Sequence, residues 1–189
     1  MRKILFLFTT CFLHVSADTH SLQQLYTAVT SEIHFTSVEF TAVDLLNGEQ
    51  ITSYNSNNQT LIPKDWIKNI KDETYWKSKT QDMQGYEETF TSKFTTVMEY
   101  LNHSNEGHTL QRMYGCERDD DGTTRGYDEY GYDGVDFISL DLKTGTWTAV
   151  SAKAVNITDK WMSKEDKHWK SYLENECIEW LAATGKVKC

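Results

Sequence analysis

The chain has 189 residues, with 28 acidic and 19 basic side chains, and its formal net charge at pH 7 is −9. This length suits one ordinary domain or two small ones. The negative charge argues against a nucleic acid or an anionic membrane surface as partner.

The first 17 residues have the features of a secretory signal peptide. They begin with Met1-Arg2-Lys3, continue with a mostly apolar run over 4–15, and end with Val15-Ser16-Ala17. An amphipathic first helix is disfavoured because the run is apolar on all sides. We therefore predict a leader at 1–17 and folding in an oxidising compartment. No later stretch is apolar enough for a transmembrane helix or a lipid-anchor tail.

The region that follows reads as strands and then one long helix. Alternating or β-rich residues predict strands at 20–29, 38–45 and 49–54, and Asn47-Gly48 predicts a turn between the last two. Pro63, the only proline, precedes a short helical piece at 65–70. Residues 72–101 lack proline and turn clusters, which predicts a long helix interrupted or bent near Gly85.

The same order of elements then restarts. Strands are predicted at 108–117, 125–133, 135–142 and 145–150, with a polar turn at 119–123. A helix is predicted from 159 to about 183, because apolar residues recur there at helical spacing.

A repeated sequence marks the first strand of each half. HSLQQLYTA at 20–28 and HTLQRMYGC at 108–116 share the pattern His-x-Leu-Gln-x-apolar-Tyr. The matching element order favours duplication over a coincidental strand match. Two such halves, 18–106 and 107–189, predict an α+β fold: one antiparallel sheet covered on one face by two long helices that flank a groove.

Three cysteines remain after removal of the leader. In an oxidising compartment an interior pair such as Cys116–Cys177 is the natural disulfide, and it would fix the second helix to the sheet. Cys189 then has no partner within the chain, which suggests an intermolecular bond or a chain that stops artificially. Sequons at Asn58, Asn102 and Asn156 predict N-glycosylation at surface positions.

Several of these segments resemble one known family. HTLQRMYGC, RGYDEYGYDGVDFISLD, WTA, YLE and CIEWL are similar to the α2 domain of major histocompatibility complex (MHC) class I heavy chains. HSLQQLYTAV, FTAVDLLNGEQ and Tyr75-Trp76 are similar to the α1 domain. DDDGTTRGY and GVDFISLDLKT are most like the bony-fish branch. The resemblance covers about residues 19–186. It implies the groove platform with an eight-stranded antiparallel sheet, the Cys116–Cys177 bond and a glycan at Asn102.

The resemblance also implies roles for individual residues. In that family the groove holds a short peptide whose charged ends are bound mainly by tyrosines. The matching end-holding residues are Tyr75 and Tyr172 at the peptide's N-terminus, with Gln24 in place of a third tyrosine, and Tyr100, Lys160 and Trp161 at its C-terminal end. The implied floor comprises Leu22, Tyr26, Leu110, Arg112, Tyr114, Asp128 and Tyr130.

Three of the eight end-holding positions depart from the family pattern. Gln24 and Thr184 (or a gap) replace tyrosines, and Ile157 replaces a threonine that helps bind the peptide's C-terminal carboxylate. A glycan on the neighbouring Asn156 would crowd that end. These departures favour looser peptide binding or a non-classical role, although Gln24 still offers hydrogen bonds.

The resemblance implies β2-microglobulin beneath the sheet, at Gln111, Glu129 and Asp136, and a T-cell or natural-killer-type receptor above the groove. The first hypothesis is therefore a peptide-display platform in the immune response. The alternative is a non-classical, peptide-free or secreted ligand for an immune receptor. A lipid-holding groove is disfavoured, because polar side chains are expected to face inward from the helices: Ser78, Lys79, Asp82, Thr89, Lys93 and His168.

No enzymatic motif, cofactor or metal site is predicted, because the histidines have no metal-ligand spacing and no nucleophile elbow or phosphate loop occurs. Family heavy chains continue into an immunoglobulin-like α3 domain, a membrane span and a cytoplasmic tail, and none of these is expected within the 189 residues. We expect the secretory pathway, with the extracellular face of the plasma membrane as the location of the full-length family and secretion if the chain is complete.

Overall fold

The computed structural model describes residues 19–30, 37–103, 107–161 and 166–184. The predicted signal peptide at 1–17 and Cys189 lie outside these residues. The side chains of 159–161 and 166–167 also lie outside the described part.

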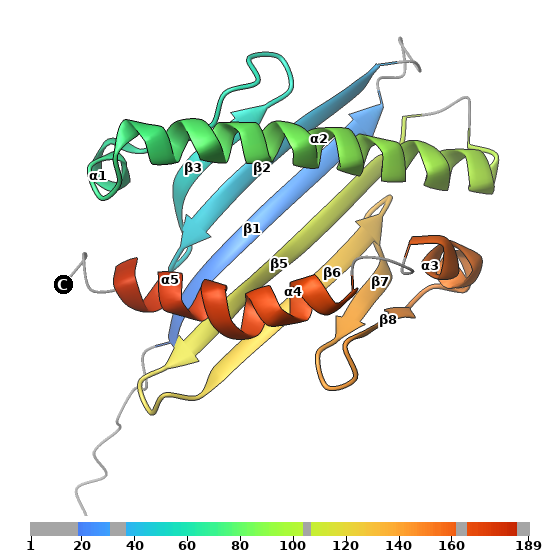
Figure 1. Cartoon of the computed structure of the whole chain (residues 1–189). Coiled ribbons are helices and arrows are strands. Elements are labelled where there is room, and N and C mark those ends of the chain that lie inside the picture. The colour runs from blue at the N-terminus through green and yellow to red at the C-terminus, as the bar shows by residue number, and fades with distance from the viewer. Residues whose placement is uncertain (1–18, 31–36, 104–106, 162–165, 185–189) are drawn as a thin grey trace, which may run out of the picture.

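Eight strands form one antiparallel sheet, as predicted (Figure 1). The strands are β1 (Thr19–Thr30), β2 (Val38–Leu46), β3 (Glu49–Asn55), β4 (Ile62–Pro63), β5 (Thr109–Asp119), β6 (Thr124–Tyr132), β7 (Val135–Asp141) and β8 (Thr146–Ala149). Their order across the sheet is β4-β3-β2-β1-β5-β6-β7-β8. The Asn47-Gly48 turn joins β2 to β3 with positive φ at both residues, which is the geometry that Asn-Gly favours in hairpins.

The two copies of the repeated sequence pair with each other at the centre of the sheet. β1 and β5 are antiparallel neighbours from Thr19↔Asp119 to Val29↔Thr109. The tyrosines of the two copies, Tyr26 and Tyr114, meet on the helix-covered face with their hydroxyl oxygens 2.6 Å apart. The sheet is therefore continuous across the two halves.

The first helical arm comprises α1 (Asp65–Lys68) and α2 (Glu73–Leu101). Asp72 caps α2 by accepting a hydrogen bond from the backbone N–H of Tyr75 at 2.8 Å. α2 has 29 residues and continues through Gly85, so the predicted interruption there is wrong. An exposed glycine costs a helix only about 1 kcal/mol, and the packing of buried Phe90 and Phe94 outweighs that cost.

The second helical arm is segmented rather than a single helix over 159–183. It comprises a 3-10 turn (η1, Ala152–Ala154), α3 (Val155–Trp161), α4 (Asp166–Ser171), a π-helical turn (η2, Tyr172–Glu176) and α5 (Cys177–Thr184). The arm also begins earlier than predicted. The π-helical turn lies in a segment that contains neither proline nor glycine, so no local signal in the sequence marks it.

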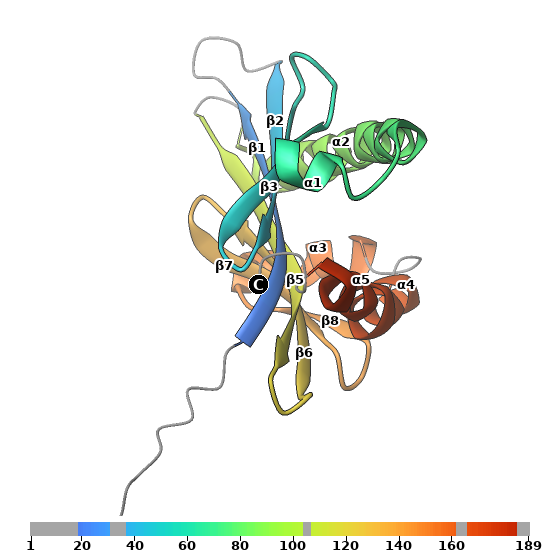
Figure 2. The same ribbon diagram turned by 90° about the vertical axis from the view of Figure 1, so that its left-hand side faces the viewer.

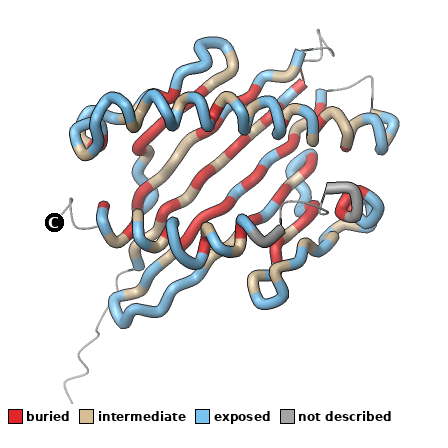
Figure 3. Tube along the Cα trace, in the orientation of Figure 1, coloured by how far each residue is buried: buried red, intermediate tan, exposed pale blue. Residues whose placement is uncertain are grey.

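Both arms cover the same face of the sheet (Figure 2). Buried residues alternate along the central strands, as Figure 3 shows. The main core is rich in aromatic rings, and a smaller cluster around Leu22 and Leu181 encloses the Cys116–Cys177 disulfide, which confirms the predicted pair. None of the helices in the described residues is long and apolar enough to cross a membrane.

Candidate functional site

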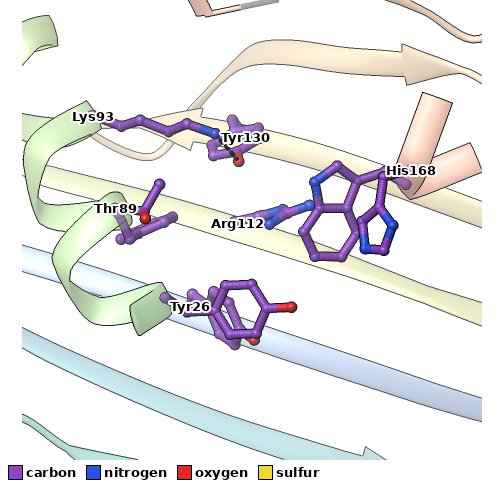
Figure 4. Close-up of a pocket in the computed structure, with 9 residues that line it drawn as sticks. Tyr26, Thr89, Lys93, Arg112, Tyr130 and His168 are labelled. Atoms are coloured by element: carbon purple, nitrogen blue, oxygen red, sulfur yellow. Dashed lines mark hydrogen bonds between the residues drawn. The ribbon is translucent and has the colours of Figure 1, made fainter. Parts of the chain in front are cut away.

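A cavity of about 330 Å³ lies between the two helical arms, above the central strands (Figure 4). α2 contributes Lys93 and Thr89, the strands contribute Tyr26, Arg112 and Tyr130, and α4 contributes His168, all drawn toward one space in Figure 4. The full lining is Tyr26, Tyr86, Thr89, Phe90, Lys93, Arg112, Tyr130, His168 and Trp169. Aromatic walls with a few polar groups are the usual make-up of a ligand pocket.

A buried ion pair forms the floor of this cavity. Arg112 donates from Nε and Nη2 to the two carboxylate oxygens of Asp128, at 2.8 and 2.5 Å. Although burial opposes its charge, the Asp128 carboxylate holds the pKa of Arg112 well above its usual value. The charge of Arg112 is thus neutralised within the floor.

The indole of Trp169 covers this ion pair. The Arg112 guanidinium carbon lies 3.9 Å from the Trp169 ring centroid and 4.4 Å from that of Tyr114. Across the groove, Tyr86 on α2 lies 6.2 Å from Trp169, centroid to centroid. The two arms therefore touch through aromatic rings in the middle of the groove.

Gln24 and Tyr172 meet at one end of the groove. Gln24 Nε2 lies 3.5 Å from the Tyr172 hydroxyl, and Gln24 pairs in register with Asp44 of β2. Burial, followed by the negative charge of Asp44, raises the pKa of Tyr172. The structure thus brings together two of the residues expected to hold one ligand end, and it adds Asp44.

The other end is formed by Tyr100 on α2 and by α3. Asn156 Nδ2 donates to the Tyr100 hydroxyl and so links the two arms. Lys160 and Trp161 are the last residues of α3, but their side chains lie outside the described part. Ile157 is fully buried in the main core. That residue therefore packs and offers no hydrogen bond to a ligand.

All seven expected floor residues are buried, and their strand positions alternate onto the helix-covered face: Leu22, Tyr26, Leu110, Arg112, Tyr114, Asp128 and Tyr130. They do not all line the cavity. Leu22 belongs to the cluster around the disulfide, and Leu110 belongs to the main core.

The expected β2-microglobulin contacts, Gln111, Glu129 and Asp136, are exposed. Gln111 and Glu129 alternate with the buried floor residues of β5 and β6 and so lie on the opposite face of the sheet, and Asp136 pairs in register with Gly131 of β6. Met113 on the same side of β5 is 38% exposed. The expected glycosylation sites Asn58, Asn102 and Asn156 are also exposed. Of these, Asn156 donates its Nδ2, the atom to which a glycan is attached, to the Tyr100 hydroxyl.

One histidine cluster was not evident from the sequence. The ligand-capable atoms of His103, His108 and Asp133 lie within 4.8 Å of one another. The histidines lack metal-ligand spacing in the sequence, but the fold brings two of them together with Asp133, which lies in the turn between β6 and β7. His108 Nδ1 is 2.9 Å from Asp133, and His103 Nδ1 is 2.9 Å from the Tyr132 hydroxyl.

Sequence reasoning found part of this site. It expected Thr89, Lys93 and His168 to face inward, and all three line the cavity. It missed Tyr86 and the closing role of Trp169, which looked like an ordinary apolar helix position. It also missed Asp44, which alternates with the buried Ala42 and Leu46 in β2. That alternation is the sequence signal that could have placed Asp44 on the helix-covered face.

Comparisons with known proteins identify the platform. The profile of the family described as "Class I Histocompatibility antigen, domains alpha 1 and 2" matches residues 18–186. The chain is 36% identical over 166 residues to the class I histocompatibility antigen F10 alpha chain of Gallus gallus, covering 87% of this chain and 48% of that protein. It is also 36% identical over 166 residues to the major histocompatibility complex class I-related protein 1 of Mus musculus, covering 86% of this chain and 48% of that protein.

A third relative, the hereditary hemochromatosis protein homolog of Ceratotherium simum, is 30% identical over 173 residues, covering 88% of this chain and 49% of that protein. The chain spans about half the length of the curated relatives it matches. The profile match, the sheet order and the two helical arms agree, and the chain belongs to the class I histocompatibility antigen family.

Proposed function

We propose that the chain is a non-enzymatic platform that binds a short peptide in the groove between its helices and displays it to T-cell receptors. The observation that carries this proposal is the cavity of about 330 Å³, with aromatic walls and a few polar groups, between the two arms. Such a cavity suits a side chain of an extended ligand. Family membership supports the immune setting.

The two ends of the groove would hold the two ends of the peptide. Polar groups at the ends give affinity that does not depend on peptide sequence, while pockets between them select side chains. We assign Gln24, Tyr75 and Tyr172 to one end. The assignment of Tyr100, Lys160 and Trp161 to the other end rests on the family resemblance.

The central cavity favours an acidic peptide side chain. Lys93 and His168 line it, and none of its nine lining residues is acidic. Asp128 lies beneath the lining and is already paired with Arg112. Lys93 therefore contributes a positive charge to the lining, with its Nζ 3.5 Å from the Tyr130 hydroxyl.

Refolding with a degenerate nonapeptide library, followed by mass spectrometry of the retained peptides, tests this proposal. We expect retained peptides enriched in Asp or Glu at one internal position, and we expect Lys93→Glu to shift that enrichment to Lys or Arg. Lys77→Glu is the matched control, because Lys77 is exposed on the same helix and pairs with Glu73. Retention of no peptide would contradict the proposed function.

We also propose that β2-microglobulin binds the face of the sheet opposite the helices. The exposed side chains of Gln111, Glu129 and Met113 support this, because they combine polar groups with an accessible apolar one. Co-refolding with β2-microglobulin, followed by size-exclusion chromatography, tests the pairing. Two separate peaks at micromolar concentration would count against it.

A second candidate is a peptide-free ligand for an immune receptor. The contact between Tyr86 and Trp169 supports it, because this contact spans the groove and Trp169 is 6% exposed. A peptide would have to arch over these rings or displace them.

For both candidate functions we propose that the chain enters the secretory pathway, reaches an extracellular location and carries glycans at Asn58, Asn102 and Asn156.

A further inference from the structure

Two histidines and one aspartate meet where the first helical arm returns to the sheet. His103 follows the end of α2, His108 precedes β5, and Asp133 lies in the turn between β6 and β7. The ligand-capable atoms of the three side chains lie within 4.8 Å of one another. None of the three lines the central cavity. The cluster therefore has no part in the proposed peptide display.

The end of α2 fixes the backbone of His103. Asn102 adopts a left-handed conformation, with a φ of 56°, and ends the helix. The backbone N–H of His103 then donates to the Met98 carbonyl oxygen at 2.9 Å, which is a common way to close a helix C-terminus. The His103 side chain is only partly buried. The backbone is therefore held in place, while the imidazole has room to rotate.

The sheet fixes the other two side chains more tightly. His108 is 7% exposed, and its backbone N–H donates to Thr30 Oγ1 at 2.9 Å. Asp133 Oδ1 accepts a hydrogen bond from the backbone N–H of Thr109 at 2.9 Å. Asp133 Oδ2 lies 2.9 Å from His108 Nδ1. The carboxylate is thus aimed at the imidazole by the backbone of β5.

Tyr132 makes the kind of contact that orients a metal-binding histidine. Its hydroxyl oxygen lies 2.9 Å from His103 Nδ1. A hydrogen bond donated by Nδ1–H fixes the tautomer in which Nε2 carries the lone pair. Metal-binding histidines commonly donate their second N–H to such a partner, which sets the orientation of the ring.

The distances within the cluster are close to those that a zinc ion requires. Zinc binds imidazole nitrogen and carboxylate oxygen at about 2.0–2.2 Å, so tetrahedral ligand atoms lie roughly 3.3–3.5 Å apart. His108 Nδ1 and Asp133 Oδ2, at 2.9 Å, are near enough to share one ion in place of a proton. The ring of His103 stacks on that of His108 with centroids 4.3 Å apart. Its nitrogen has to approach by at most about 1.5 Å, which rotation of the partly buried ring supplies.

We propose that His103, His108 and Asp133 bind a zinc ion, with water in the fourth position. Two imidazoles and a carboxylate suit zinc, whereas magnesium and calcium prefer oxygen ligands alone. The ion would tie the end of the first helical arm to the sheet. The disulfide does this for the second arm, and residues 19–103 contain no cysteine.

Calorimetric titration and thermal unfolding of the refolded, untagged chain test the site after a chelator has been added and removed. We expect one zinc ion to bind per chain. Zinc chloride at about 100 times its dissociation constant should raise the melting temperature by about 5–10 °C. The same concentration of magnesium chloride should cause no shift, because two of the three ligands are nitrogen atoms.

Two ligand variants and one matched control locate the bound ion. His103→Gln and Asp133→Asn should each weaken zinc binding about tenfold or more and remove most of the shift in melting temperature. Asp133→Asn keeps an oxygen for the backbone N–H of Thr109. His20→Gln is the control, because His20 has the position of His108 in the first copy of the repeated sequence. Among the described residues, His20 belongs to no cluster of three ligand-capable side chains, so this variant should respond to zinc as the natural chain does.

Cobalt(II) gives a readout that does not depend on stability. Four-coordinate cobalt absorbs visible light much more strongly than the hydrated ion does, so the natural chain and His20→Gln should show this absorption and His103→Gln should not. The absence of any zinc-induced shift in the natural chain would overturn the site. An equal shift in the natural chain, His103→Gln and Asp133→Asn would also overturn it, because the ion would then bind elsewhere. No peptide is used, so these results stand apart from the test of peptide display.

Discussion

Single residues in the groove carry charge that water does not solvate. Arg112 and Asp128 satisfy each other through two hydrogen bonds, with Asp128 at 0% and Arg112 at 4% exposure. Asp44, by contrast, has one hydrogen bond and no ion-pair partner among the described residues. The first pair organises the floor, whereas the second carboxylate accepts its hydrogen bond from Thr52.

Removing one member of the buried pair should destabilise the protein strongly. Arg112→Met leaves Asp128 buried and unpaired, and we expect it to lower the free energy of unfolding by about 3–5 kcal/mol. The double variant Arg112→Met/Asp128→Leu removes both charges and should recover most of that loss. Denaturant unfolding measures both; a loss below about 1 kcal/mol in the single variant would refute the buried pair.

The charged form of Asp44 should lower the free energy of unfolding of the ligand-free protein above pH 6. Its pKa in the folded state is raised from the ordinary value of 3.8 to about 6, so the folded state binds the proton more tightly than the unfolded state does. Stability therefore falls as the pH rises from about 4 to 6, and the cost persists at higher pH.

We expect Asp44→Asn to raise the free energy of unfolding by about 1–3 kcal/mol at pH 7 and by little at pH 4. Chemical denaturation at the two pH values measures the difference. A gain of equal size at both pH values would show that charge burial is not its cause.

At the scale of elements, the strands and the helical nature of the second arm were predictable from sequence. The alternation of β1 and β5 and the Asn47-Gly48 turn are local signals, and the predicted and observed strand bounds agree closely. β4 has only two residues and includes Pro63, so it lacks a pattern of its own. The π-helical turn at Tyr172–Glu176 was not predictable, because no proline or glycine marks it.

The disulfide fixes the last part of that arm to β5. Cys116 and Cys177 are separated by 61 positions, and closing a loop of that size is worth about 4 kcal/mol in the chain-entropy model. Replacing both cysteines by alanine should therefore lower the free energy of unfolding by about 2–5 kcal/mol. Thermal unfolding checks this, and an unchanged melting temperature would refute the role.

At the scale of the whole molecule, the sheet presents one face to the helices, and the other carries exposed side chains such as Gln111, Met113 and Glu129. The duplicated first strand predicted the shared sheet, and the family resemblance supplied the roles expected of the end-holding residues. The closure by Tyr86 and Trp169 and the partly buried carboxylate of Asp44 depend on side chains from distant segments. These contacts were therefore beyond sequence reasoning.

Met113 tests the partner face. We expect Met113→Glu to weaken the association with β2-microglobulin by about tenfold, since it places a charge in an apolar contact. Val155→Glu is the control, because Val155 is an exposed valine on α3, on the helix-covered side. Surface plasmon resonance measures both, and equal affinities for the two variants would exclude Met113 from the interface.

The central claim, that the groove displays peptides, is tested most directly by acid elution of the protein purified from the medium or surface of expressing cells. Mass spectrometry of the eluate should find a set of short peptides that share an acidic internal position. An eluate without peptides, from a protein that remains folded, would contradict the claim and favour the peptide-free receptor ligand.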